Sequence, residues 1–225
     1  MTDAPLILLS HGSRHPEAAG GIAALAEAVS DTLGVLVCDA HLDFSDDTLP
    51  AVARRLADEG HEQAVVIALL FSTGYHARHD VPAEITEATS ASGLSLVNAG
   101  TLGAGADIAE LISARFQSER PAAAELVIYP VGSSTATALA DYERLRSLVA
   151  GLVSARVLVH PATRAPFPLE ELELSDAHLI PLFVTEGLLL DKARHHLPPH
   201  TTISSPLGTD LAPLIAARYR QAVSP

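Results

Sequence analysis

The feature that most constrains this chain is an alternation of short apolar runs with helical segments. Four apolar runs in the first half are predicted strands, and they cover residues 6–9, 35–38, 64–70 and 94–97. Each is followed by a segment with helical spacing or a helix-start signal, and these segments cover residues 16–33, 49–57, 82–90 and 108–116. Such alternation is typical of β-α units. The sequence therefore predicts an α/β fold with a parallel sheet and helices on both of its faces.

The same pattern begins again in the second half of the chain. Residues 117–124 show no apolar periodicity and are a predicted linker. Beyond it, residues 126–134 align with 6–14, residues 182–185 with 70–73, and residues 214–219 with 111–116. We interpret this as an internal duplication that produces two similar parallel-sheet domains. The predicted domains are residues 1–118, expected to carry the site, and residues 125–225, a degenerate repeat.

The composition argues against several classes of protein. Hydrophobic residues make up 48% of the chain and charged residues 18%, which is typical of a globular protein. The net charge of −13 argues against nucleic acid as a partner, because such binders need a basic surface. A single cysteine, Cys38, excludes an internal disulfide. We find no run apolar enough to span a bilayer and no basic signal-peptide region, so we expect a cytoplasmic protein with no membrane partner.

Two histidines of the first half lie just past predicted strands. His11 stands in Leu-Leu-Ser-His-Gly-Ser-Arg, and His76 stands in Phe-Ser-Thr-Gly-Tyr-His. In open α/β sheets, binding sites form at the carboxyl ends of the strands. If these two strands are neighbours, both imidazoles face one space, where they can bind a borderline divalent metal or transfer protons near neutral pH. Alternatively, each histidine is a hydrogen-bonded structural residue of a strand-to-helix loop.

A third polar segment follows the second predicted strand and so reaches the same edge of the sheet. It consists of Leu-Asp-Phe-Ser-Asp-Asp-Thr-Leu-Pro at residues 42–50. Its carboxylates, Asp43 and Asp46 among them, can complete a metal site or accept protons. An N-cap cluster before the next helix explains at least one of these acids as well. The second half has Val131 in place of His11, so we expect it to be a structural partner.

The remaining histidines give weaker signals. His41 is isolated in the sequence, whereas His160 and His178 fall in apolar stretches and are expected in the core. The chain contains no Gly-x-Gly-x-x-Gly, P-loop or Gly-x-Ser-x-Gly motif. Nucleotide binding and serine hydrolysis therefore have no support in the sequence.

Three segments taken together resemble those of the CbiX/SirB-type sirohydrochlorin chelatases. Residues 10–14, Ser-His-Gly-Ser-Arg, resemble the His-Gly-Ser-Arg opening of that family. Residues 74–82 resemble its Gly-x-His-x-x-x-Asp-Ile-Pro segment, and residues 42–50 resemble its Glu-Phe-x-Glu-Pro-Ser/Thr segment. The detailed resemblance covers residues 5–118, and the remainder is similar to the degenerate second repeat of the family's long form. It implies a flavodoxin-like, chelatase-type fold for each domain.

The resemblance implies a class II chelatase, a lyase that inserts Fe²⁺ or Co²⁺ into sirohydrochlorin on the way to sirohaem or cobalamin. The metal is then a substrate, the tetrapyrrole is the partner, and no tightly bound cofactor is expected. His11 and His76 would hold the metal together with Asp43, and His11 would accept pyrrole N–H protons. The residues expected to contact the tetrapyrrole are Asp46, Phe71, Ser72, Thr73, Gly74 and Tyr75, with Arg14 and Arg78 suited to its carboxylates.

The chain departs from the family pattern in the acidic segment. Both glutamates of the Glu-Phe-x-Glu pattern are aspartates here, Asp43 and Asp46, and Asp47 replaces the usual proline. Two other functions remain open. One is a non-catalytic tetrapyrrole- or metal-binding protein on the same scaffold, and the other is a histidine phosphatase, although that class has Arg where this chain has Ser10. Because the chain carries its own second repeat, we expect a monomer with an internal pseudo-two-fold axis.

Overall fold

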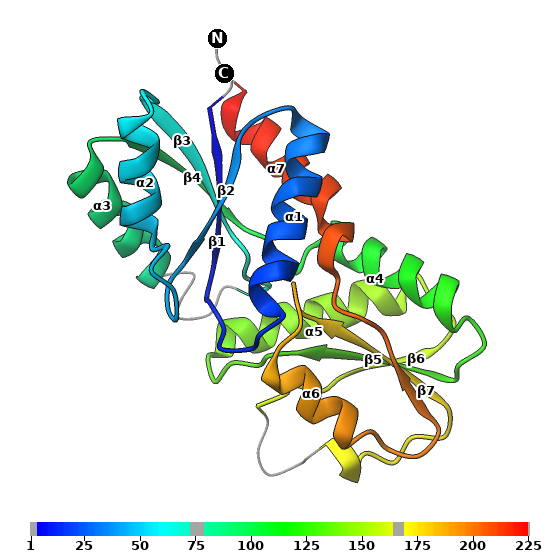
Figure 1. Cartoon of the computed structure of the whole chain (residues 1–225). Coiled ribbons are helices and arrows are strands. Elements are labelled where there is room, and N and C mark those ends of the chain that lie inside the picture. The colour runs from blue at the N-terminus through cyan, green and yellow to red at the C-terminus, as the bar shows by residue number, and fades with distance from the viewer. Residues whose placement is uncertain (1–3, 73–78, 164–168, 225) are drawn as a thin grey trace. The chain divides into compact units, whose positions relative to one another are not determined.

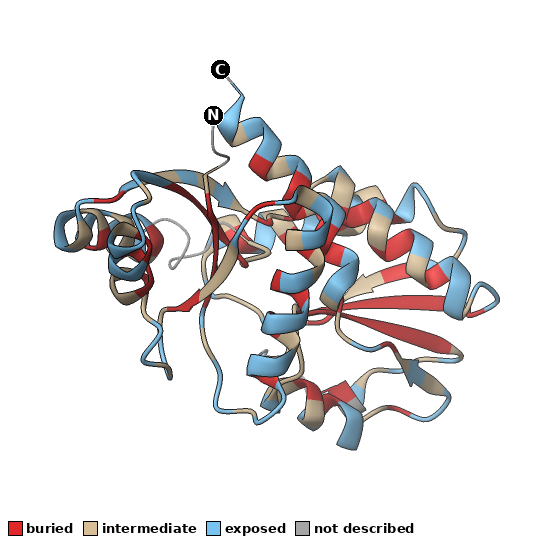
Figure 2. Cartoon of the chain, turned by 45° about the horizontal axis from the view of Figure 1, so that its top comes forward, coloured by how far each residue is buried: buried red, intermediate tan, exposed pale blue. Residues whose placement is uncertain are grey.

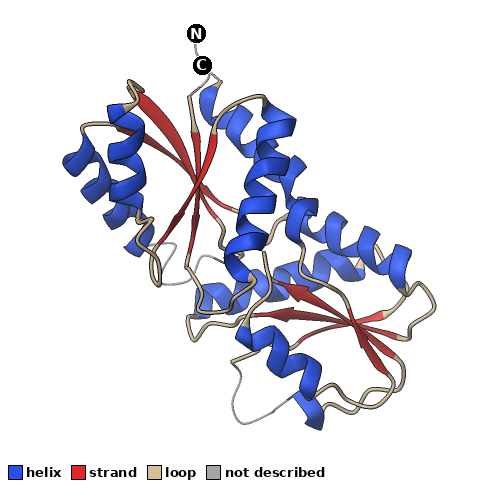
Figure 3. Cartoon of the chain, in the orientation of Figure 1, coloured by secondary structure: helices blue, strands red, loops and turns tan. Residues whose placement is uncertain are grey.

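The computed structural model describes residues 4–72, 79–163 and 169–224, and Figure 1 labels the elements that they form. The chain divides into two compact units. Unit 1 consists of Met1–Leu102 and Gly208–Pro225, and unit 2 consists of Gly103–Leu207. Each unit contains a four-stranded parallel sheet flanked by helices, as Figure 3 shows. The predicted α/β class with two similar parallel-sheet domains is confirmed.

The sheet of unit 1 has the strand order β2-β1-β3-β4, and all neighbouring strands are parallel. The strands are β1 (Leu6–Ser10), β2 (Val37–His41), β3 (Gln63–Ala68) and β4 (Ser95–Thr101). Figure 1 shows the helices on its two faces, which are α1 (Ala18–Leu33) with α7 (Ala212–Val223), and α2 (Leu49–Asp58) with α3 (Val81–Ser92). The parallel order brings the carboxyl ends of β2, β1 and β3 to one edge of the sheet.

Strand β1 lies at the centre of the core of unit 1. All five of its residues are buried, which explains its uninterrupted apolar run. Side chains alternate between the two faces of a strand, so Ile7 and Leu9 join the apolar cluster formed with α2 and α3. Figure 2 shows the buried residues concentrated on the strands and on one side of each neighbouring helix. The amphipathic helices predicted from apolar spacing thus cover a sheet whose two central strands, β1 and β3, are almost entirely apolar and buried.

Unit 2 repeats this topology with the strand order β6-β5-β7-β8, again with all neighbours parallel. Its strands are β5 (Glu125–Pro130), β6 (Arg156–Val159), β7 (Ala177–Leu182) and β8 (Thr201–Ile203). Its helices are α4 (Ala106–Glu119), α5 (Ala136–Ala150) and α6 (Leu188–His195), with a 3-10 helix, η2 (Leu169–Glu171). In both units the first strand lies between the second and the third. The duplication that would explain this shared order stays a prediction.

The boundaries of the two compact units differ from those of the predicted domains, residues 1–118 and 125–225. Helix α4, which falls within residues 1–118 except for its last residue, belongs to unit 2, whereas α7 belongs to unit 1. The hydroxyl of Tyr219 on α7 donates to the carbonyl of Ala4 at 2.6 Å. Arg218, also on α7, donates to the carbonyls of Thr101 and Leu102. Apolar spacing shows that each helix has a buried face, but it does not show which sheet that face covers.

Two boundaries in the first half also differ from the prediction. The second strand is Val37–His41 rather than residues 35–38, because its ladder with β1 continues to the pair of Ser10 and His41. Residues 117–119 extend α4 and do not open a linker. Among the residues that the structure describes, no helix combines the length and the apolar character needed to cross a membrane.

Candidate functional site

The candidate site lies at the carboxyl edge of the sheet in unit 1. Because β1 lies between β2 and β3, the two strands that precede His11 and His76 are neighbours, as the metal-site hypothesis requires. His11 directly follows β1 and is exposed. Phe71 and Ser72 follow β3, and both are half-buried. The remaining predicted residues of this segment lie outside the described residues, namely Thr73, Gly74, Tyr75, His76 and Arg78.

Two backbone hydrogen bonds continue the β1–β2 ladder beyond the ends of both strands. The N–H of Leu42 donates to the carbonyl of Ser10, and the N–H of Asp43 donates to the carbonyl of His11, each at 3.0 Å. The loops that carry His11 and Asp43 are therefore tied together, and both side chains are exposed. The structure thus places the backbones of these two predicted site residues side by side.

Gly12 allows this close approach. Its φ of 89° lies in the left-handed region, which residues with a side chain rarely adopt. A Cβ atom at this position would lie only 1.9 Å from the carbonyl oxygen of Asp43. The glycine of the Ser-His-Gly-Ser-Arg segment is therefore required by the backbone that places His11.

Phe44 connects the acidic segment with the residues around His11. The ring of Phe44 lies 6.4 Å from that of His11 between centroids, and the two planes meet at 84°. The Cζ atom of Arg14 lies 4.7 Å from the centroid of the Phe44 ring, a cation–π arrangement. Phe44 is 53% exposed. The sequence motif includes Phe44, but no local pattern predicts that its ring reaches both His11 and Arg14.

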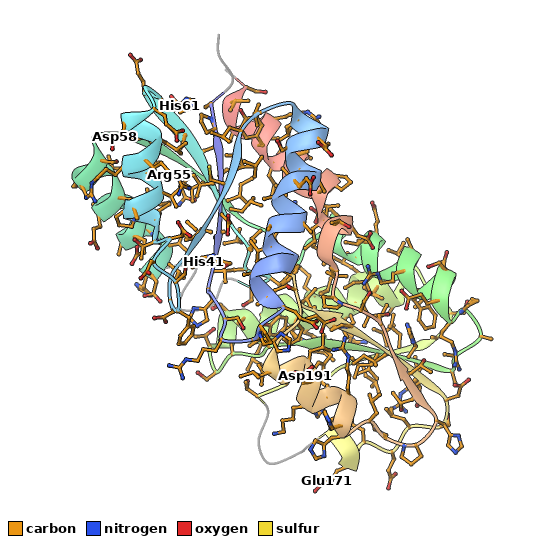
Figure 4. The ribbon with its side chains drawn as sticks, viewed as in Figure 1. His41, Arg55, Asp58, His61, Glu171 and Asp191 are labelled. Atoms are coloured by element: carbon orange, nitrogen blue, oxygen red, sulfur yellow. The ribbon has the colours of Figure 1, made fainter. Side chains whose placement is uncertain are left out.

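A hydrogen-bond chain of buried and half-buried side chains links β1 with β2 at the same edge. The Nδ1 atom of His41 lies 2.7 Å from Ser10 Oγ, and its Nε2 atom lies 3.2 Å from Asp39 Oδ2. The hydrogen bond from His41 holds the pKa of the Asp39 carboxyl below its usual range. Figure 4 labels His41 at the end of β2. Asp39 is its i−2 neighbour on one strand face, which the sequence could reveal, whereas Ser10 comes from another strand.

The acids before α2 do not cap that helix. The N-cap is Thr48, whose side chain accepts a backbone N–H of the first turn at 3.4 Å. Asp47 Oδ1 instead lies 3.5 Å from a guanidinium nitrogen of Arg55, whose side chain is labelled in Figure 4. The side chains of Asp43 and Asp46 are exposed. Capping therefore explains the presence of Thr48 and leaves the two predicted site acids available to a ligand.

Three metal ligands do not come together within the described part of the chain. Across residues 4–72, 79–163 and 169–224, no group of three His, Cys, Asp or Glu side chains is arranged to hold a metal ion. The predicted ligand His76 lies outside these ranges. The described geometry therefore concerns two of the three predicted ligands, His11 and Asp43.

The corresponding edge of unit 2 has the same backbone arrangement with different side chains. The N–H of Thr163 donates to the carbonyl of Val131 at 3.1 Å, as that of Asp43 does to His11. Gly132 follows with a φ of 104°, and a Cβ there would lie 2.5 Å from Thr163 Oγ1. Unit 2 thus has an apolar residue and a hydroxyl at the two positions where unit 1 has an imidazole and a carboxylate.

The buried His178 of unit 2 lies beside polar side chains from β8, from the residue that follows β8 and from α4. His178 on β7 has Nδ1 at 2.8 Å from Thr202 Oγ1, and its Nε2 lies 2.9 Å from Ser204 Oγ and 3.1 Å from Glu119 Oε2. Burial lowers the pKa of His178, and Glu119 opposes this effect. His160 is also buried. The core positions predicted for both histidines are confirmed.

Comparison with known proteins matches the first half of the chain to one family. The model of the CbiX family matches residues 5–119. Sirohydrochlorin cobaltochelatase of Methanocaldococcus jannaschii is 30% identical over 78 residues, which are 34% of this chain and 54% of that protein. Sirohydrochlorin cobaltochelatase of Saccharolobus solfataricus is 36% identical over 77 residues, which are 34% of this chain and 59% of that protein. The chain thus spans little more than half the length of these relatives.

Solved structures resemble the whole chain. SirB from Bacillus subtilis with Fe³⁺ has a TM-score of 0.74 and 20% identity, and the match covers 98% of this chain and 94% of SirB. The sirohydrochlorin chelatase SirB from Bacillus subtilis subspecies spizizenii in complex with cobalt has a TM-score of 0.80 and 19% identity over the same shares. At this identity the likeness concerns the fold. Because the CbiX model matches just over half of the 225 residues, this chain belongs to the CbiX family.

Proposed function

We propose that this protein is a chelatase that inserts Fe²⁺ or Co²⁺ into sirohydrochlorin. The observation that carries the proposal is the backbone link between His11 and Asp43, within the segment that the CbiX model matches. Relatives over this segment are named sirohydrochlorin cobaltochelatase. Imidazole is a good ligand for both metals, so these residues do not by themselves select one of them.

The proposed chemistry exchanges a metal ion for protons. His11, His76 and Asp43 hold the metal while it loses water. Insertion of a divalent ion releases two N–H protons from the macrocycle, which balances the charge. The His11 nitrogen that gives up the metal can then accept one of these protons, and an imidazole can do so near neutral pH. The side chain of His11 is exposed, so the second proton and later the first can leave to water.

Substrate binding is assigned to the residues around this centre. Arg14 and Arg78 pair with carboxylates of the tetrapyrrole, because a guanidinium can form two parallel hydrogen bonds with a carboxylate. The residues proposed to contact the macrocycle are Asp46, Phe71, Ser72, Thr73, Gly74 and Tyr75. Asp43 and Asp46 are each one methylene shorter than the family's glutamates, which places their carboxylates closer to the backbone.

The test is turnover by the purified full-length chain. Sirohydrochlorin is incubated with Fe²⁺ under anaerobic conditions, or with Co²⁺, and its absorption change is followed against a protein-free blank. We expect faster insertion with protein than without it. We expect His11→Ala and His76→Ala each to reduce the protein-dependent rate of insertion at least a hundredfold, as removal of a proton acceptor does. His195→Ala, which changes an exposed histidine at the end of α6, is the matched control.

Equal rates with protein and without it would overturn the enzyme proposal. If the protein binds sirohydrochlorin or the metal but does not accelerate insertion, a non-catalytic binding protein explains the fold and the site better. Comparison of the initial rates with Fe²⁺ and Co²⁺ assigns the metal. The monomeric state, the cytoplasmic location and the origin by internal duplication remain part of this proposal.

A further inference from the structure

Phe44 has an exposed aromatic ring and a left-handed backbone, and both are unfavourable for a phenylalanine. It is 53% exposed, although burial of an aromatic ring of this size is strongly favourable. Its φ of 62° lies in the left-handed region, where a bulky residue is a genuine outlier. Such outliers persist where the surrounding structure enforces them, often at functional sites. The loop around Phe44 is enforced in this way, because its backbone is bonded to the turn that carries His11.

The surroundings of the ring indicate the kind of ligand that it suits. Its edge contact with His11 places the ring beside a proposed metal ligand. Arg14 lies over the ring and brings a positive charge to a flat apolar surface. Three carboxylates of the same segment, Asp43, Asp46 and Asp47, repel an anionic ligand. A ligand with many carboxylates therefore binds better here if an uncharged surface contacts the flat face of the ligand.

We propose that the Phe44 ring stacks on the face of the tetrapyrrole through its side opposite Arg14, with Arg14 held over the ring for a substrate carboxylate. This inference rests on the proposed function and adds a substrate-binding residue to it. Stacking on an aromatic ring contributes equally to substrate and transition state, so it lowers KM with little effect on kcat. It also accounts for the strain, because a relaxed backbone at residue 44 would move the ring away from its present place between His11 and Arg14.

Three substitutions of Phe44 distinguish the effect of the aromatic ring on substrate binding from the effect of the backbone conformation. Phe44→Tyr keeps the ring, and we expect a KM for sirohydrochlorin close to that of the wild type. Phe44→Leu removes the ring, and we expect KM to rise about two- to tenfold with kcat changed less than twofold. Phe44→Gly removes the ring and suits the left-handed backbone. We expect it to raise KM as Phe44→Leu does, without lowering the thermal unfolding midpoint.

The control and a second readout distinguish failure of this inference from failure of the proposed function. Leu36→Ala changes a residue that is 46% exposed and precedes β2, at the opposite end of that strand, and should leave KM unchanged. Binding of Co²⁺ alone should be the same in all variants. If the wild type turns over and Phe44→Leu keeps its KM, the inference is wrong. If the wild type does not turn over, binding of metal-free sirohydrochlorin still decides it: binding weakened by Phe44→Leu supports stacking, and binding that is absent or unaltered refutes it.

Discussion

The turn after the first strand of each unit has the same backbone and different side chains. Gly12 and Gly132 both have positive φ, and each lies against the loop that follows the second strand of its unit. Only unit 1 places an imidazole before this glycine, since Val131 stands where His11 stands. The glycine is therefore a requirement of the fold in both units. The chemistry of this edge, by contrast, resides in side chains that can change without disturbing the turn.

The strongest test of this view is the removal of each glycine. In Gly12→Ala the new Cβ meets a backbone oxygen at 1.9 Å in a left-handed conformation, so we expect the free energy of unfolding to fall by about 3–5 kcal/mol. In Gly132→Ala the new Cβ would lie 2.5 Å from the Thr163 hydroxyl, which can rotate, and 2.9 Å from Pro161 Cβ, which must shift slightly, so we expect about 2–3 kcal/mol. Denaturant unfolding measures both changes.

Gly34→Ala is the control for the conformation alone. Gly34 has a φ of 72°, and a Cβ atom added there would meet nothing within 4 Å, so only backbone strain of about 1 kcal/mol is expected. A loss in Gly12→Ala no larger than that in Gly34→Ala would show that the approach to Asp43 does not constrain the turn, and the comparison between the two units would lose its basis.

The buried histidines of the two units have partners of the same kind. His178→Leu leaves the buried Ser204 hydroxyl without its imidazole partner, while the side chain of Glu119 is 37% exposed and can bind water, so we expect a loss of about 1–2 kcal/mol. His41→Leu leaves the buried Ser10 hydroxyl and Asp39, whose side chain is 38% exposed and can also bind water, so we expect a similar loss of about 1–2 kcal/mol. Denaturant unfolding measures both losses, and a loss in one variant that is several times that in the other would contradict this assignment.

The same two networks also respond to different ranges of pH. Burial lowers the pKa of His178 below 6.5, so the unfolded chain takes up that proton first as the pH falls. Its contribution to stability is therefore complete above pH 6.5 and is lost as the pH falls through the lower folded pKa. The pKa of Asp39 is lowered from 3.8, so its contribution is present above pH 3.8 and is lost only below it. Just below pH 6.5, the free energy of unfolding should depend less on pH in His178→Gln than in the wild type. In Asp39→Asn its dependence on pH in this range should be the same as in the wild type.

The smallest expected difference concerns the caps of one helix in each unit. Thr48 caps α2 and Thr135 caps α5, with side-chain oxygens 3.4 and 3.3 Å from the backbone nitrogens they accept from. We expect Thr48→Ala and Thr135→Ala each to reduce the free energy of unfolding by about 1 kcal/mol. Thermal unfolding of both variants checks this, with Ser as the replacement that keeps the cap. A much larger effect of Thr48→Ala would indicate that it also supports the acidic segment.

The sequence predicts those features that follow from local periodicity. The apolar run of β1 and the helical spacing of α1 fall where expected, and His11 lies at the end of its strand. Individual hydrogen bonds between distant segments, and the local backbone that they impose, are not predicted. The bond between Ser10 and His41 joins two strands, and the left-handed backbone of Phe44 follows from how its loop is tied to the next one. Local sequence carries no sign of either.

The place of α7 has a consequence for the order in which the chain acquires its structure. A chain is made from its N-terminus, so residues of unit 2 leave the ribosome before Gly208–Pro225 do. Until then the face of unit 1 that α7 covers lacks its helix, and the hydrogen bond from Tyr219 to Ala4 cannot form. The unit that carries the candidate site is therefore the first to be started and the last to be completed.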